Sequence, residues 1–191
     1  MTVRKQFLEK LATLSMFAAI SIVLVSLIRV PMFLPFLEYD PADIPILISG
    51  ILYGPAAGLI ITVVVSAMQT LIFSSLSGII GFIMHVIATG GMVVICSLIF
   101  RATDGQSRKT TMRLGTALIT GSIFMILVMV PMNLLLTPIY AKMSASDIWE
   151  QFMFVGIVPF NVVKAVINSV ATLLLYPIIC RAIPGKIFYK G

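Results

Sequence analysis

Long apolar stretches constrain this chain more than any other feature of its sequence. The last one runs from Gly156 to Cys180, and the first covers about residues 10–30. A helix needs roughly 20 apolar residues to cross the ~30 Å hydrocarbon core of a bilayer. Only 10% of the 191 residues are charged, whereas a soluble domain has about 25%. The sequence therefore predicts an all-α, multi-pass membrane protein that forms one integral membrane domain over residues 1–191.

The charges are distributed unevenly among the loops. Lys and Arg gather before the first apolar stretch, between Arg101 and Arg113, and after the last stretch, while five of the seven acids lie at about 31–43 and 138–155. Cytoplasmic loops carry an excess of Lys and Arg. We therefore expect both termini and the 101–113 loop in the cytoplasm and the acidic loops outside. The net charge of +6 then reflects topology, and no nucleic-acid partner is expected.

This orientation requires an odd number of spans between Asp43 and Arg101. Helix breakers divide that region at Gly54-Pro55 and at the Ser/Gly cluster of residues 74–78. We therefore predict a bundle of six transmembrane helices whose second helix is short, because Pro55 ends it. The expected spans cover about residues 10–30, 44–54, 56–73, 79–100, 113–136 and 157–180.

Lys164 interrupts the last apolar stretch. A charge at membrane depth costs roughly 2.5–3.5 kcal/mol on insertion scales and usually marks function. Asn161 lies three residues earlier and Asn168 four residues later, so all three share one helical face. We expect this face to line a binding site. The alternative is that Lys164 reaches the interface or pairs with a distant acid, although we expect no acidic partner at similar depth.

Motifs of an enzyme or a motor are missing from the sequence. It has no Walker A motif, no Cys/His metal spacing and no intramembrane carboxylate pair. His85, the single histidine, is expected to bond a neighbouring helix rather than to relay protons. We expect no catalytic residue, no metal and no cofactor, so the energy for any uphill transport must come from a partner.

Two further segments carry unusual patterns. In the outer loop, Asp43 can cap the second helix, whereas Tyr39 and Asp40 beside it suggest a lid over a polar site. In the first helix, Ser15 and Ala19 form a small-x-x-x-small pair. Such pairs let two helices approach closely. The sequence does not separate docking of a partner from packing within this chain.

Three motifs resemble the riboflavin-specific substrate-binding (S) component of energy-coupling factor (ECF) transporters. They are Leu37-Glu38-Tyr39-Asp40-Pro41-Ala42-Asp43-Ile44-Pro45, Leu52-Tyr53-Gly54-Pro55 and Pro159-Phe160-Asn161-Val162-Val163-Lys164. The resemblance extends to the length, the six spans and their orientation. It departs from the family at Ser15, where the typical Ala-x-x-x-Ala docking motif has its first alanine.

The resemblance implies a high-affinity riboflavin-binding subunit in the cell membrane. Such a subunit associates with a transmembrane coupling subunit and two cytoplasmic ATPases, through a coupling interface that includes Ser15 and Ala19. The substrate-binding residues that the resemblance implies are Asn161, Lys164, Asn133, Tyr39, Asp40 and Gln69. An S component for FMN or for another vitamin such as thiamine, and a non-transport subunit of a membrane complex, remain as alternatives.

The chemistry of these residues suits a flavin. The isoalloxazine edge presents carbonyl acceptors, ring nitrogens and one N–H, which match the donor and acceptor of an asparagine amide. Lys164 adds positive charge near the N-terminus of its helix, where the helix dipole is also positive. Phe160 and the methionines can cover the ring faces. The same positive end can accept the phosphate of FMN, so this argument does not separate the two ligands.

Overall fold

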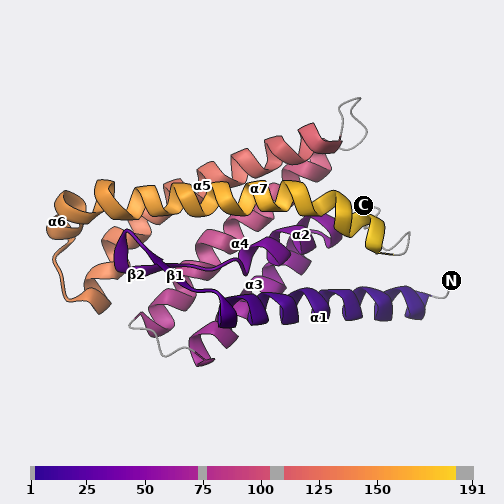
Figure 1. Ribbon diagram of the computed structural model, residues 1–191, viewed down its shortest axis with the longest axis horizontal. Helices are drawn as coiled ribbons and strands as arrows, with labels where there is room; N and C mark the ends of the chain where they lie inside the picture. The colour runs from indigo at the N-terminus through magenta and orange to yellow at the C-terminus, as the bar shows by residue number, and fades with distance from the viewer. Residues whose placement is uncertain (1–2, 73–76, 104–109, 184–191) are drawn as a thin grey trace.

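The computed structural model describes residues 3–72, 77–103 and 110–183. The described chain is almost entirely helical (Figure 1). Its elements are α1 (Val3–Leu27), β1 (Val30–Met32), β2 (Leu34–Tyr39), α2 (Asp43–Tyr53), α3 (Pro55–Ile72), α4 (Gly78–Ala102), α5 (Thr110–Ala141), α6 (Ala145–Asp147), the π-helix η1 (Ile148–Ile157) and α7 (Val158–Ala182).

Five helical segments among the described residues are long and apolar enough to cross a membrane. They are α1 without its first residue, α3, α4, α5, and the continuous segment formed by α6, η1 and α7. The sixth apolar helix, α2, has 11 residues and is therefore only about 16 Å long at 1.5 Å per residue. The chain is thus an all-α multi-pass membrane protein, and each predicted span overlaps one of these helices.

The short helix α2 lies inside the bundle, and ten of its eleven residues are buried. It packs against α1, α3, α4 and α7, so its backbone polar groups are shielded from lipid by protein. Gly54 ends it in the left-handed region (φ 105°), and Pro55 starts α3. The predicted Gly-Pro break is therefore the turn between the two helices.

The close approach of α2, α3 and α4 depends on two glycines. A Cβ atom added to Gly58 would collide with the backbone of Gly50 and the side chain of Val93. A Cβ atom on Gly50 would meet the same valine and Ser97. The three helices can therefore sit this close only because both positions lack a side chain.

The two expected outer loops contain more regular structure than predicted. The first holds an antiparallel hairpin in which Val30 pairs with Tyr39 and Pro31 with Glu38, and Phe33 takes a left-handed conformation at its tip (φ 63°). The prediction of a loop over about residues 138–155 is wrong for most of that range, since α5 continues to Ala141 and α6 starts at Ala145. A capping box between Ser144 and Asp147 restarts the helix there.

The N-terminal end of α1 and the C-terminal end of α7 lie at one end of the bundle, and the hairpin and α6 lie at the other (Figure 1). This arrangement fits an even number of crossings. Some of the residues used in the topology prediction lie outside the described part of the chain. They are the breaker residues 74–76 and the cations Arg108, Lys109, Lys186 and Lys190.

Candidate functional site

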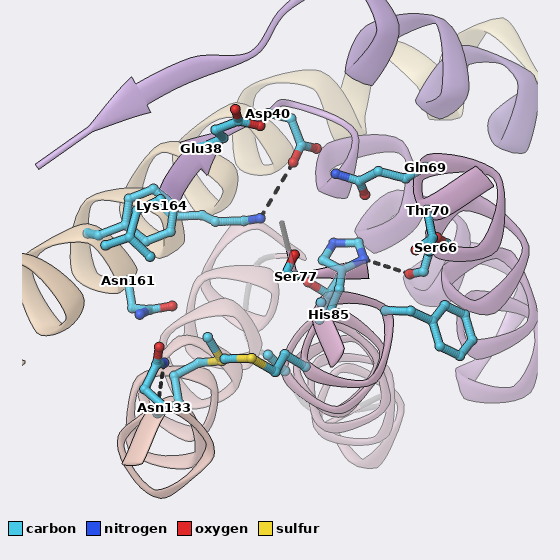
Figure 2. A pocket seen from close by; sticks show the side chains of 18 of the residues that line it. Glu38, Asp40, Ser66, Gln69, Thr70, Ser77, His85, Asn133, Asn161 and Lys164 are labelled. Atoms are coloured by element: carbon cyan, nitrogen blue, oxygen red, sulfur yellow. Dashed lines mark hydrogen bonds and ion pairs between the residues drawn. The ribbon is translucent and has the colours of Figure 1, made fainter. Parts of the chain in front are cut away.

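A cavity of about 470 Å³ opens between the helices near the hairpin. Its volume falls in the roughly 300–1,000 Å³ range of small-molecule sites. Side chains from α3, α4, α5 and α7 form its walls, and residues of β2 and the following turn contribute at its upper edge in Figure 2. Five of the six predicted substrate-binding residues line it, namely Asp40, Gln69, Asn133, Asn161 and Lys164.

One wall carries the predicted polar face of α7 together with Asn133 of α5. Figure 2 shows Asn161 between Asn133 and Lys164 on this side of the cavity. The amide nitrogen of Asn161 donates to the carbonyl of Ile157 at 2.8 Å, and that of Asn133 donates to Met129 at 2.8 Å. Each bond stays within its own helix and uses one amide hydrogen. Asn161 therefore keeps a second N–H and its carbonyl oxygen for a ligand.

Lys164 has acidic partners, so the expectation that it has none at similar depth is wrong. Its Nζ lies 3.1 Å from Oδ2 of Asp43 and 3.8 Å from Oδ2 of Asp40. The lysine is only 7% exposed. Asp40 precedes the short α2, and Asp43 is its first residue. The position of α2 inside the bundle brings both acids to the depth of Lys164 on α7. The sequence expectation failed because it counted both acids with the outer loop.

Asp43 is a fully engaged buried carboxylate. Besides Lys164, its Oδ2 accepts from the amide of Asn168 at 3.1 Å, while Oδ1 accepts from Thr89 at 3.3 Å and contacts Nε2 of His85 at 2.8 Å. Asp43 does not cap α2 with its side chain, because it is the first residue of that helix and follows the N-cap Ala42. Its carboxylate instead joins α2 to α4 and α7.

His85 bonds to neighbouring helices, as expected. Its Nδ1 lies 2.6 Å from the hydroxyl of Ser66 on α3, and its Nε2 faces Asp43. A carboxylate only accepts hydrogen bonds, so Nε2 carries a proton. The imidazole thereby connects α3, α4 and α2 at the edge of the cavity, where Figure 2 shows it beside Ser66.

Tyr39 is the one predicted substrate-binding residue that does not line the cavity. Its hydroxyl donates to Oδ1 of Asn168 at 3.1 Å. Burial, and next the nearby Asp43, raise the pKa of Tyr39 above its ordinary value, so the phenol keeps the proton that it donates. The residue ties β2 to α7 behind the cavity wall.

The opposite wall, from α3 and α4, offers hydroxyl and amide groups. Gln69, Thr70 and Ser66 project from α3 in Figure 2, facing Lys164 across the cavity. Apolar side chains complete the walls, and they are Leu37, Phe82, Met84, Ala88, Met125, Met129 and Phe160. The cavity thus combines an apolar lining with polar groups on two sides.

The hairpin closes over the cavity with an ion pair of its own. Arg29, which precedes β1, pairs with Glu38 of β2, and both line the cavity. Asp40 then follows the strand, and its Oδ1 accepts from the backbone N–H of Ala42 at 3.1 Å. These contacts give the outer loop, which the sequence suggested as a lid, a defined conformation.

The small-residue pair of α1 lies on a different surface. Ser15 and Ala19 are exposed, whereas Phe17, Ser21 and Val25 of the same helix are buried against the bundle. The pair is therefore not packed against any other part of the chain that the structure describes.

Sequence reasoning missed the residues that support the lysine. These are Asp43 as a charge partner, and His85, Thr89 and Ser66 around it. Asn168 was assigned to the polar face of α7, but it bonds Asp43 and Tyr39 behind that face. The sequence did contain a signal for these contacts, because it has one cation within an apolar stretch, a single histidine, and an acid next to a short helix.

Known transporter components resemble this chain in sequence. Residues 9–176 match the family described as ECF transporter, substrate-specific component. The chain is 29% identical over 174 residues to the riboflavin transporter RibU of Staphylococcus aureus, covering 88% of each protein. It is 26% identical over 176 residues to the riboflavin transporter FmnP of Bacillus subtilis, covering 88% of this chain and 90% of that one.

A solved structure of the S component of a bacterial ECF transporter has the same fold. It superimposes with a TM-score of 0.75 at 27% sequence identity, over 92% of this chain and 98% of that one. The likeness therefore spans the whole bundle described above, including the elements that form the cavity.

Proposed function

Because this chain belongs to the family of substrate-specific components of ECF transporters, we propose that it is the high-affinity riboflavin-binding subunit of such an importer. The members of this family are transporter components rather than enzymes. Two relatives that match most of the chain are riboflavin transporters. The ligand of this chain is then riboflavin, taken up from outside the cell.

The observation that carries the proposal is the composition of the cavity. Asn133, Asn161 and Lys164 stand along one wall and offer amide donors and acceptors plus an ammonium group to the edge of a flat heterocycle. Phenylalanine and methionine side chains supply apolar contact for its faces. The hydroxyls and amide of α3 are suited to the ribityl chain, whose hydroxyl groups both donate and accept.

The charges around the cavity favour riboflavin over FMN. Among the described residues, the Lys and Arg side chains that line it are Arg29 and Lys164, and each is paired with a carboxylate. The phosphate of FMN would therefore have to displace a carboxylate from one of these cations, or lie close to the carboxylates of Glu38 and Asp40. Because bringing like charges together is unfavourable, we expect FMN to bind more weakly than riboflavin.

Riboflavin binding can be measured directly in the purified chain. Bound flavin gives a yellow preparation, and quenching of its own fluorescence on addition of protein reports the Kd. This signal is better than the fluorescence of Trp149, because that residue packs edge-on against Phe154 and does not line the cavity. A preparation that binds thiamine and no flavin would contradict the proposal and favour an S component for another vitamin.

The partners follow from the family. A transmembrane coupling subunit docks on the exposed Ser15/Ala19 face of α1, and two cytoplasmic ATPases supply energy. All six apolar helices are assigned as spans, with α2 covering its part of the bilayer inside the bundle, and both termini lie in the cytoplasm. The exposure of Ser15 and Ala19 supports this docking face, because small residues on a lipid-facing surface allow a second helix to approach closely.

A further inference from the structure

Two buried carboxylates hold Lys164, and they differ in their distance from its ammonium group and in their position relative to the cavity. Asp43 lies at 3.1 Å from the ammonium and is 1% exposed, and it does not line the cavity. Asp40 lies at 3.8 Å and does line the cavity. Figure 2 shows it at the end of β2, across from the lysine. Asp43 therefore lies behind the lysine, away from the cavity, whereas Asp40 faces the cavity.

The position of Asp43 is fixed from several directions. It starts the buried helix α2, and Thr89 and His85 of α4 hold one carboxylate oxygen while Asn168 of α7 holds the other. Asp40, in contrast, accepts a hydrogen bond from a backbone N–H within its own turn. A carboxylate with this many partners on two other helices, α4 and α7, cannot shift without breaking several hydrogen bonds.

The ammonium group of Lys164 has three N–H donors. A bond to Asp43 uses one of them and sets the direction of the other two. Without that bond, the flexible lysine chain can turn toward Asp40 at the cavity surface, where it would fill the space that a ligand needs. Preorganised donors bind more tightly because less rotational freedom is lost on binding.

We propose that Asp43 is the positioning residue for Lys164, holding its ammonium against the back of the cavity so that the remaining N–H groups face the flavin. This inference rests on the proposed riboflavin site. Asp40 is the exchangeable partner, which the ligand replaces. Asp43 itself does not touch the ligand and acts through the lysine.

The alternative is that Asp43 only ties the helices together. The variants Asp43→Asn, Lys164→Met and their double variant separate the two roles, and Glu150→Gln, which removes an exposed acid outside the cavity, is the control. In Asp43→Asn, the side chain keeps one oxygen for His85 and Thr89. Asn168 can turn its amide to meet the new NH₂ group, and the Tyr39 hydroxyl then accepts from that amide instead of donating to it. Only the ion pair with Lys164 then has no substitute.

We expect Asp43→Asn to weaken riboflavin binding about 10- to 100-fold, as for loss of a hydrogen bond to a buried charge. Glu150→Gln should leave the Kd unchanged. In the Lys164→Met background, Asp43→Asn should have no further effect on the Kd. The absorbance spectrum of flavin bound to Asp43→Asn should match that of flavin bound to Lys164→Met, because both lack the aligned ammonium.

Equal effects of Asp43→Asn in the wild-type and Lys164→Met backgrounds would overturn the inference, and so would an unchanged Kd in Asp43→Asn. If Asp43→Asn does not fold, Asp43→Glu provides the test, since it keeps the charge but moves the ammonium by one methylene. Wild-type affinity in Asp43→Glu would also contradict positioning. Absence of riboflavin binding by the wild-type protein would instead refute the proposed function.

Discussion

At the scale of single residues, the site is a group of buried charges that balance one another. Lys164 and Asp43 both lie within the bundle and are almost fully buried. A buried pair gains little over apolar residues of the same size, but removal of one partner leaves the other uncompensated. This asymmetry makes the lysine important for stability as well as for binding.

Lys164→Met tests this balance. We expect the free energy of unfolding to fall by about 3–5 kcal/mol, because Asp43 loses its closest cation. Thermal unfolding in detergent, followed by circular dichroism, measures the change. Asp43→Asn/Lys164→Met removes one charge of each sign, so it should unfold at a higher temperature than Lys164→Met alone. Unchanged stability of Lys164→Met would mean that the ion pair is not formed in the membrane protein.

The two cavity asparagines lead to a different expectation. Asn161→Ala and Asn133→Ala should each weaken riboflavin binding by about 1–3 kcal/mol, the cost of leaving a ligand group unpaired in a buried site. Stability should change little for Asn161→Ala, because the protein bond of that amide stays within its own helix turn. Fluorescence titration gives both Kd values.

Thr172→Val is the matched control for these asparagines. It removes a buried α7 hydroxyl that pairs with no group in the described parts of the chain and lies outside the cavity. Its Kd should equal that of the wild type. A similar loss in Thr172→Val and Asn161→Ala would indicate that any polar change in α7 disturbs the site.

At the scale of elements, α1 is tied to the turn that carries both acids. Ser21 donates across to the carbonyl of Ala42 at 3.0 Å, whereas Thr13 and Ser26 bond carbonyls four residues back in α1 itself. Ala42 lies between Asp40 and Asp43. The hydroxyl of Ser21 thus connects the helix with the exposed docking face to the start of α2.

Ser21→Ala should lower the free energy of unfolding by about 1 kcal/mol, the usual net value of a buried hydrogen bond. It should also weaken riboflavin binding slightly, because the acid-bearing turn loses an anchor. Ser26→Ala is the control, since its hydroxyl is exposed and bonds only its own helix. Chemical unfolding and flavin titration on both variants provide the comparison, and identical behaviour of the two would remove the assigned role of Ser21.

At the scale of the whole molecule, the proposed ligand site and the proposed docking face are separate surfaces. The cavity lies near the hairpin end of the bundle, whereas Ser15 and Ala19 are exposed along α1. One surface can therefore be changed without the other. In the proposed importer, the partner ATPases supply energy through the docking surface.

Ala19→Trp should block docking and preserve binding. A large side chain at this position prevents close approach of a partner helix, so uptake by the assembled transporter should fall while the Kd of the isolated chain stays unchanged. Leu174→Trp, at an exposed position on α7, should leave both intact. Loss of riboflavin binding in Ala19→Trp would show that this face supports the bundle.

Uptake in liposomes tests the energy source. The chain reconstituted alone should bind riboflavin without accumulating it, and addition of the coupling subunit, both ATPases and ATP should start accumulation. Radiolabelled riboflavin retained after filtration gives the measurement. Accumulation driven by a pH gradient with this chain alone would contradict dependence on partner ATPases.

Much of the architecture followed from the sequence because membrane insertion depends on local composition. Apolar length predicted helices that overlap all six in the structure, including the short α2 ended by Gly54-Pro55. Spacing on a single helix also grouped Asn161 with Lys164, because residues three apart share a face whatever surrounds them.

Only the tertiary structure decided what Lys164 pairs with. Asp43 is 121 residues away in the chain, and its partnership depends on how deeply the short α2 sits among α1, α3, α4 and α7. The hairpin and the π-helix before α7 likewise depend on packing at one end of the bundle. Hydrophobic length determines where a helix forms, but the burial depth of a charge depends on the neighbours that surround it.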